Sequence, residues 1–123
     1  MKKLEIDSEF HDRRGSILTF IPDTPILEMT AITSKMGVER GYHYHPEFDE
    51  YVLLLRGHGT YYQQDPRTGE DMLSIDLYSG ECIYFPANCA HRLECKTDMH
   101  MVALLTKPWK ECNEPIVHVG RRG

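Results

Sequence analysis

The sequence predicts an all-β protein, a single antiparallel jelly-roll β-barrel, and three observations lead to this expectation. Short apolar or alternating segments recur about every 8–12 residues, with turn residues between them. No window of a dozen residues shows an apolar stripe at helical spacing. A chain of 123 residues with 41% hydrophobic and 27% charged side chains fits one globular domain with its own core.

Apolar and polar side chains alternate in the first expected strand, residues 27–32. A continuous apolar run of the buried type forms the second, residues 51–55. Pro66 and Gly69 mark a hairpin turn between the third and the fourth, and Pro86, Asn88 and a polar turn at 96–98 separate the last three. The strands are expected at residues 27–32, 51–55, 60–63, 73–78, 82–85, 92–95 and 99–106.

The remaining segments complete one domain, residues 1–123, whose core barrel is expected to cover about residues 15–107. Residues 108–123 contain Trp109 and two prolines, and we expect an irregular flap or a strand exchanged with a partner. The open sheet edges of a jelly roll must be covered, and the N-terminal strand and the tail have no place in a minimal barrel. We therefore expect a homodimer.

Charge, hydropathy and cysteine usage exclude several partners and locations. The net charge is -5 and the pI is about 5.8, which is the wrong sign for binding nucleic acid. Acidic residues interrupt segment 4–10, so it lacks the apolar stretch of a secretory signal, and the apolar run 51–55 is too short to cross a bilayer. The four cysteines form no C-x-x-C pair, which predicts free thiols. We therefore expect a cytoplasmic protein with no membrane partner.

One segment carries a pattern typical of a metal site. Residues 37–57 read GVERGYHYHPEFDEYVLLLRG, which places His43 and His45 two residues apart and Glu50 five residues further on. Side chains at i and i+2 of a strand point to the same face, so one metal ion can bind both imidazoles. After the turn at Pro46, the Glu50 carboxylate can reach back toward the same point.

A second segment, GECIYFPANCAH at residues 80–91, ends at His91, which we expect to complete the ligand set from the facing sheet. Three imidazole nitrogens and one carboxylate oxygen suit one divalent transition metal, namely Fe, Mn, Ni, Zn, Co or Cu, rather than Ca or Mg. Four protein ligands leave two positions of an octahedral ion open, as a catalytic metal requires. Metal affinity is expected to fall as the pH drops through about 6.5, because protonated histidine cannot bind metal.

These two segments resemble the two motifs of the cupin superfamily. The first motif, G-x5-H-x-H-x4-E-x6-G, is matched at every defining position from Gly37 to Gly57. The second, G-x5-P-x-G-x2-H-x3-N, is matched at its first glycine, proline and histidine, whereas Asn88 replaces a glycine and Cys95 an asparagine. Asparagine tolerates positive φ, so we expect Asn88 to make the turn. The resemblance implies a six- to eight-stranded β-barrel with the metal inside, usually as a homodimer.

The N-terminal half is similar to a subgroup of small cupins that act on nucleotide-linked 4-keto sugars, the ketoisomerase and 3,5-epimerase group. The similarity lies in DRRG at residues 12–15 and in RGYHYH at 40–45, which correspond to D-x-R-G and R-G-x-H-x-H of that group. In that group the histidines act as acid and base without a metal, and the position of Glu50 is commonly not a ligand. Here the full ligand set is present, which favours a metal.

Two classes of function remain open. The first is an enzyme acting on a small oxygen-rich substrate such as a sugar or sugar derivative, by isomerisation or epimerisation or, alternatively, as a non-haem iron dioxygenase. The second is a non-catalytic protein that binds or senses a small molecule. In the first class, Tyr61 is a candidate for proton transfer beside a polarised carbonyl. Arg40, with Arg56 and Arg92, is a candidate for holding a phosphate or carboxylate, the other interpretation being solvated strand ends.

Overall fold

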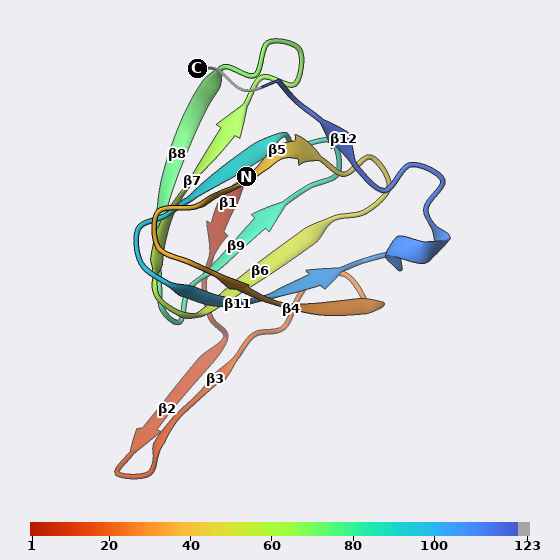
Figure 1. Ribbon diagram of the computed structural model, residues 1–123. Helices are drawn as coiled ribbons and strands as arrows, with labels where there is room; N and C mark the ends of the chain where they lie inside the picture. The colour runs from red at the N-terminus through yellow and green to blue at the C-terminus, as the bar shows by residue number, and fades with distance from the viewer. Residues whose placement is uncertain (121–123) are drawn as a thin grey trace.

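Two antiparallel five-stranded sheets face each other and form a barrel in the computed structural model, which describes residues 1–120 (Figure 1). The strands are β1 (Lys2–Leu4), β2 (Ser8–Asp12), β3 (Gly15–Thr19), β4 (Glu28–Ser34), β5 (Glu39–Tyr44), β6 (Glu50–Arg56), β7 (His58–Gln64), β8 (Asp71–Tyr78), β9 (Cys82–Phe85), β10 (His91–Cys95), β11 (Met99–Leu105) and β12 (Val117–His118). One sheet has the order β1-β9-β6-β11-β4 and the other β12-β5-β10-β7-β8. The predicted all-β jelly roll is confirmed.

The core lies between the two sheets and consists of side chains that alternate inward and outward along each strand. In β11, Met99, Met101, Ala103 and Leu105 are buried, whereas the residues between them are half-buried or exposed. The pairing of β11 with β6 sets Ala103 beside Val52, which is also buried. Burial of this apolar layer, at about 25 cal/mol per Å² of apolar surface, holds the sheets together.

The strands expected from periodicity are present, with ends that differ by no more than two residues from the expected ones. Five strands lie outside the seven expected ranges. β5 was implied only by the spacing of His43 and His45, and β1, β2, β3 and β12 are short or exposed and bury no alternating face. β1 pairs with β9, so the barrel sheet includes the N-terminal residues outside the expected core range. The four cysteines are free thiols, as expected.

The tail after β11 lies along one end of the barrel. It forms a 3-10 turn, η1 (Trp109–Glu111), and then β12, which pairs with β5 of the same chain. The expected flap or exchanged strand at 108–123 extends past residue 120, so its last three residues lie outside the described residues. Within residues 1–120, η1 is the only helical element, and no helix there is long and apolar enough to cross a membrane.

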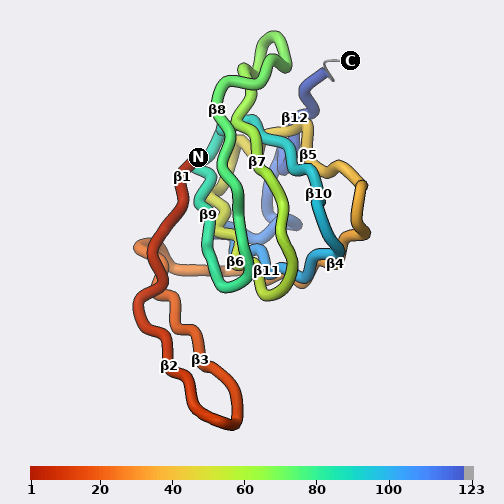
Figure 2. The backbone as a smooth tube through the Cα atoms, turned by 90° about the vertical axis from the view of Figure 1, so that its left-hand side faces the viewer, coloured from red at the N-terminus to blue at the C-terminus, as the bar shows by residue number. Residues whose placement is uncertain are grey.

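The hairpin of β2 and β3 projects away from the barrel (Figure 2). Every residue of β2 is exposed, and in β3 only Leu18 is partly covered. Phe10 lies opposite Ile17 in the register, and these two side chains are 53% and 62% exposed. A two-stranded hairpin alone is marginally stable in water, and this arm leaves both apolar side chains largely uncovered by the rest of residues 1–120.

Candidate functional site

Three histidines come together inside the barrel, next to a buried glutamate. The ring nitrogens of His43, His45 and His91 that could bind a metal ion lie within 4.8 Å of one another. Glu50 Oε1 lies 3.7 Å from Nε2 of His45 and 3.7 Å from Nε2 of His91. The four residues that the motif spacing singles out are therefore neighbours in space.

The two sheets contribute unequally to this cluster. The expectation that His91 approaches from the facing sheet is wrong, because His91 begins β10 and pairs with His43 of β5 in the same sheet. Glu50, the first residue of β6, is the member that comes from the facing sheet. Neighbouring strands of a jelly roll can be far apart in the sequence, so strand patterns alone do not assign a segment to a sheet.

A β-bulge at Gly41 and Tyr42 sets the direction of the chain segment that carries His43 and His45. Gly41 has φ 95° and Tyr42 has φ 60°, and the β5–β10 register shifts at this point. A Cβ atom at residue 41 would lie 2.6 Å from the carbonyl oxygen of His91, so only glycine fits. The extra residue changes the phase of the alternation, and Arg40 and His43 both line the cavity although they are three positions apart.

Backbone carbonyl groups orient two of the imidazoles. His45 Nδ1 lies 2.9 Å from the carbonyl oxygen of Pro115, and His91 Nδ1 lies 2.9 Å from that of Cys89. A carbonyl oxygen can only accept a hydrogen bond, so Nδ1 carries the proton in both rings and Nε2 offers its lone pair. Both Nε2 atoms lie near Glu50, an arrangement typical of histidines that bind a metal.

Burial sets the charge of the cluster. Desolvation, with the neighbouring histidines as a second cause, lowers the pKa of His43 to about 4 and that of His91 to about 3. It also lowers the pKa of His45. Desolvation raises the pKa of Glu50 to about 7. The imidazoles are therefore neutral and free to donate electron pairs at neutral pH, and a cation bound among them would favour the ionised glutamate.

Two buried phenylalanines keep water from one side of the cluster. Phe85 stacks on His91 with ring centroids 4.0 Å apart, and Phe48 stacks on His45 at 4.6 Å. These contacts restrict the rotamers of both imidazoles. The donor types, the tautomers and the dry surroundings fit a divalent transition metal held by the three histidines and Glu50.

His43, His91 and Glu50 line a cavity of about 340 Å³ inside the barrel, together with the candidate catalytic residue Tyr61. Tyr61 is buried, and its hydroxyl donates to the sulfur of Met101 at 3.6 Å. Burial, with the nearby Glu50 as a further cause, raises the pKa of Tyr61. The phenol therefore keeps its proton at neutral pH and can serve as an acid rather than as a base.

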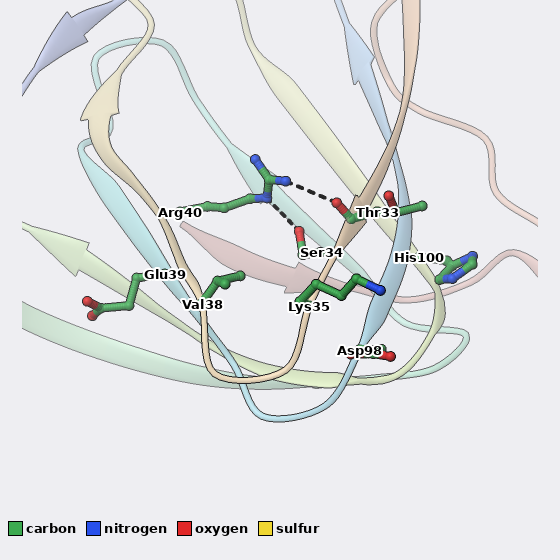
Figure 3. A pocket seen from close by; sticks show the side chains of 8 residues that line it. All are labelled: Thr33, Ser34, Lys35, Val38, Glu39, Arg40, Asp98 and His100. Carbon is green, nitrogen blue, oxygen red and sulfur yellow. Dashed lines mark hydrogen bonds between the residues drawn. The ribbon is translucent and has the colours of Figure 1, made fainter.

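Arg40, the second candidate catalytic residue, lies between this cavity and a more open pocket of about 510 Å³ (Figure 3). Its guanidinium bridges β5 to β4, because Nε donates to Ser34 Oγ at 2.5 Å and Nη2 to the carbonyl oxygen of Thr33 at 3.0 Å. Lys35 and His100 line the same pocket (Figure 3). Arg40 thus joins the cluster to a pocket with further basic side chains.

The other two candidate anchoring arginines lie elsewhere. Arg92 forms ion pairs with Asp71 and Glu94, and its guanidinium lies over the Tyr62 ring at 3.8 Å from the centroid. Arg56 is exposed at the end of β6. Arg56 therefore fits the interpretation as a solvated strand end, whereas Arg92 is largely buried in an ion-pair network, and Arg40 is the arginine that reaches the cavity.

Two residues of the tail border the site without any signal in the motif spacing. His118 lies opposite His43 in the pairing of β12 with β5, and their ring centroids are 6.3 Å apart. The ring of Trp109 lies 5.9 Å from that of His45. A two-residue strand and a 3-10 turn carry no periodicity, so the only available signal was a lone tryptophan in a polar tail.

The sequence from residue 32 to residue 107 matches the family described as the cupin domain. This chain belongs to the cupin family. The matched range includes the three histidines and Glu50, and it confirms the resemblance inferred from the two motifs. A comparison with curated proteins gave no match.

Solved structures with the same fold include three that are described as isomerases or epimerases. A 3,4-ketoisomerase from Helicobacter canadensis is 21% identical with a TM-score of 0.76, covering 89% of this chain and 85% of its own. A 3'-monoepimerase from Streptomyces bikiniensis, in complex with dTDP-quinovose, is 20% identical with a TM-score of 0.77, covering 97% and 73%. A dTDP-6-deoxy-D-glucose-3,5-epimerase from Legionella pneumophila is 17% identical with a TM-score of 0.73, covering 90% and 68%. At these identities the likeness shows the fold.

The departures from the second cupin motif leave the site intact. Asn88 has φ 68°, which confirms that asparagine makes the turn where the cupin pattern has glycine. Its backbone N–H donates to the carbonyl oxygen of His45 at 2.9 Å. Cys95 is buried in the core, and burial raises the pKa of its thiol. Neither departure removes a member of the cluster.

Titration of Glu50, rather than of the imidazoles, is expected to control metal binding near neutral pH. The raised pKa of Glu50 means that a proton competes for its carboxylate below pH about 7. The imidazole of His43 stays neutral until pH about 4. The affinity for Ni²⁺ should therefore fall about tenfold per pH unit below about 7, and Glu50→Gln should bind more weakly but with little pH dependence between about pH 5 and 7. Calorimetric titration measures both, and an equal slope in the variant would assign the effect to histidine.

Proposed function

We propose that this cupin binds one divalent transition metal through His43, His45, Glu50 and His91 and isomerises or epimerises a sugar derivative that carries a negative charge. The observation that carries the proposal is the continuity of three features. A buried donor cluster, an inner cavity and a second pocket, whose charged lining comprises Lys35, Arg40, Glu39 and Asp98, follow one another past Arg40. Pockets with a few convergent polar groups are the usual sites of small-molecule chemistry.

The chain supplies groups for both proton transfer and orientation. A metal held by His43, His45, His91 and Glu50 would supply Lewis acidity toward a substrate carbonyl. Tyr61, protonated in the cavity wall, can donate a proton to a carbonyl oxygen on which negative charge develops, and the carboxylate of Glu50, which lines the same cavity, can accept the proton that leaves the neighbouring carbon. The buried phenylalanines Phe48 and Phe85 exclude water and so strengthen the electrostatic interactions at that point.

The open pocket is suited to a phosphate or diphosphate group on the substrate. Its acidic side chains are already engaged, because Asp98 accepts from the backbone N–H of Met36 and Glu39 accepts from Arg92. The side chain of Lys35 makes no hydrogen bond or ion pair to any residue in 1–120, although its carbonyl oxygen accepts from the backbone N–H of Val38, and Nη1 of Arg40 makes no hydrogen bond within the same residues. Basic groups without partners favour an anion, and guanidinium suits phosphate geometry.

The similar structures support the same substrate class. The three proteins are described as a 3,4-ketoisomerase, a 3'-monoepimerase and a 3,5-epimerase, and two of them hold dTDP-linked sugars. Reactions of these kinds exchange a proton on a carbon next to a carbonyl. The donor cluster and Tyr61 face the cavity in which such a carbon would lie.

The test is hydrogen exchange in D₂O. Protein loaded with Mn²⁺, Fe²⁺ or Ni²⁺ and incubated with dTDP-4-keto-6-deoxyglucose is expected to incorporate deuterium beside the carbonyl, as seen by NMR. A panel of sugar phosphates tests other anionic sugars. Absence of uptake across the panel, with oxygen consumption on an oxidisable acid, would replace the isomerase proposal by the dioxygenase alternative.

A metal-free reaction is the second candidate, favoured by the 3.7 Å separation of Glu50 from two neutral imidazoles. Such a pair can accept and return a proton without a cation. Exchange that persists undiminished after treatment with EDTA and dialysis would support this candidate and contradict metal dependence.

We also propose that the protein is a homodimer. Besides the hairpin pair Phe10 and Ile17, the outer face of β11 and β4 carries apolar side chains. Leu104 of β11 pairs with Met29 on β4, which is 73% exposed, whereas its partner on β6, Tyr51, is already buried against Phe20. An apolar sheet face beside an apolar arm is the composition of a surface that a second copy covers.

Charging the hairpin is expected to weaken this dimer. Phe10→Asp together with Ile17→Asp places two carboxylates on the apolar face, whereas Ser16→Asp places one on the opposite face of the same hairpin. Light scattering at micromolar concentration should report a dimer for the native chain and the Ser16 variant, and monomer for the double variant. A native chain that is monomeric under these conditions would contradict the proposal.

A further inference from the structure

A third cavity, of about 200 Å³, reaches the cluster from another direction. It shares His43 and Glu50 with the inner cavity. It borders the beginning of β4, at Glu28, whereas the pocket of Arg40 borders the end of that strand. The space around the cluster therefore has two arms, and only the arm toward Arg40 has a role in the proposed function.

The tail contributes Trp109 and Ile116 to the wall of this third cavity. Trp109 lies at its rim, with ring centroids 5.9 Å from His45 and 6.2 Å from Phe48. The backbone N–H of Trp109 donates to Glu28 Oε1 at 2.9 Å, which fixes the start of η1 against β4. Ile116, on the segment leading to β12, lines the cavity as well. The tryptophan is thus held in place by its backbone while its ring remains beside the cluster.

Trp109 is more exposed than a residue that only closes the core would be. It is 41% exposed, whereas the other apolar side chains lining the two inner cavities are buried or half-buried. One side of the indole contacts Phe48 and His45, and much of the rest is open. A large aromatic surface left uncovered beside a polar cluster is typical of a ligand contact.

We propose that Trp109 contacts the substrate, stacking on the C–H face of its sugar ring and so selecting which face the ring turns to the cluster. This inference rests on the proposed function, since it places the ring beside His43 and Glu50 while the charged group lies near Arg40. The π face of indole carries negative charge, and the C–H groups on one face of a pyranose carry slight positive charge. Glu28 Oε2 has no hydrogen-bond partner within residues 1–120 and can accept a sugar hydroxyl at the ring edge.

The chain contains a single tryptophan, so its fluorescence reports on this position without labelling. The probes are dTDP-glucose, which has the sugar ring, and dTDP, which lacks it. With the full-length, Ni²⁺-loaded protein, dTDP-glucose is expected to shift and change the tryptophan emission, and dTDP to bind with a much smaller change. Calorimetry measures binding of both probes independently of fluorescence.

Variants of Trp109 distinguish stacking on the sugar ring from a purely structural role of the indole in packing. Trp109→Ala is expected to weaken dTDP-glucose binding about five- to tenfold and to leave dTDP binding unchanged, and Trp109→Phe should retain most of the affinity. Tyr78→Ala, which removes an exposed aromatic ring stacked on His58 away from these cavities, is the matched control and should bind both probes normally. Thermal unfolding checks that each variant is folded.

The possible outcomes distinguish failure of the role of Trp109 from failure of the proposed function. If dTDP-glucose binds as well to Trp109→Ala as to the native protein, and leaves the native emission unchanged, the role of Trp109 is refuted and the proposed function stands. Equal losses for dTDP and dTDP-glucose would also refute it, because they would show a structural effect on the whole site. If neither nucleotide binds and no anionic sugar binds either, the proposed function fails and the inference about Trp109 fails with it.

Discussion

Replacing His91 or His45 by alanine is expected to remove the metal from the purified protein. Each substitution deletes one nitrogen from a cluster whose ligand atoms lie within 4.8 Å of one another, and each imidazole is held by a backbone carbonyl that aims its Nε2. Loss of a hydrogen-bonding partner of a ligand alone costs about 10- to 100-fold in metal affinity, so loss of the ligand should cost more than about 100-fold. Elemental analysis should fall from one equivalent to none.

A fluorescence titration makes the same comparison in solution. Ni²⁺ and Cu²⁺ bound at the cluster should quench Trp109, whose ring centroid is 5.9 Å from that of His45. Quenching should saturate at one equivalent in the native protein and be absent in both alanine variants. His11→Ala, which removes an exposed histidine on the projecting hairpin, should behave as the native protein does. Retention of a full equivalent by both cluster variants would show that the metal binds elsewhere.

Tyr61→Phe is expected to abolish most of the hydrogen exchange and leave metal binding intact. The substitution removes only the phenolic oxygen, whose one hydrogen bond goes to the weakly accepting sulfur of Met101. Fold and cavity shape should therefore change little. Removal of a general acid typically costs about 100- to 10,000-fold in rate. Deuterium uptake from D₂O, followed by NMR, gives the ratio directly.

The neighbouring tyrosine provides the control. Tyr62 alternates with Tyr61 along β7 and lies under the Arg92 guanidinium instead of lining the cavity. Tyr62→Phe should exchange hydrogen at close to the native rate. If Tyr61→Phe and Tyr62→Phe were equally active, with native metal content, proton donation by Tyr61 would be excluded and its place in the cavity would be one of packing alone.

The sequence was sufficient to predict those parts of the molecule in which apolar and polar side chains alternate along a strand. Strands with one buried face were recognised within two residues of their ends, and His43, His45 and Glu50 were grouped because motif spacing and strand geometry agree. The hairpin arm and β12 were not recognised, since they bury no alternating face. Their positions depend on contacts between segments far apart in the chain.

Topology and backbone conformation limited the prediction of the site. His91 was assigned to the facing sheet because the sequence indicated its strand but did not indicate which strands pair with it. In the structure these are β5 and β7. The role of Arg40 in the cavity depends on positive φ at Gly41 and Tyr42, and tyrosine gives no sign of such a conformation. Trp109 and His118 approach the site only because the tail folds back along β4 and β5.

The bulge at Gly41 divides β5 into two halves whose side chains face in directions that are set independently. On one side of this joint lies Arg40, which faces the pocket that Lys35 also lines, and on the other lie the histidines. As long as residue 41 remains glycine, substitutions before it can alter the lining of that pocket while the histidines keep their positions. The strand is therefore modular: the pocket and the histidine cluster can diversify independently in descendants of this chain.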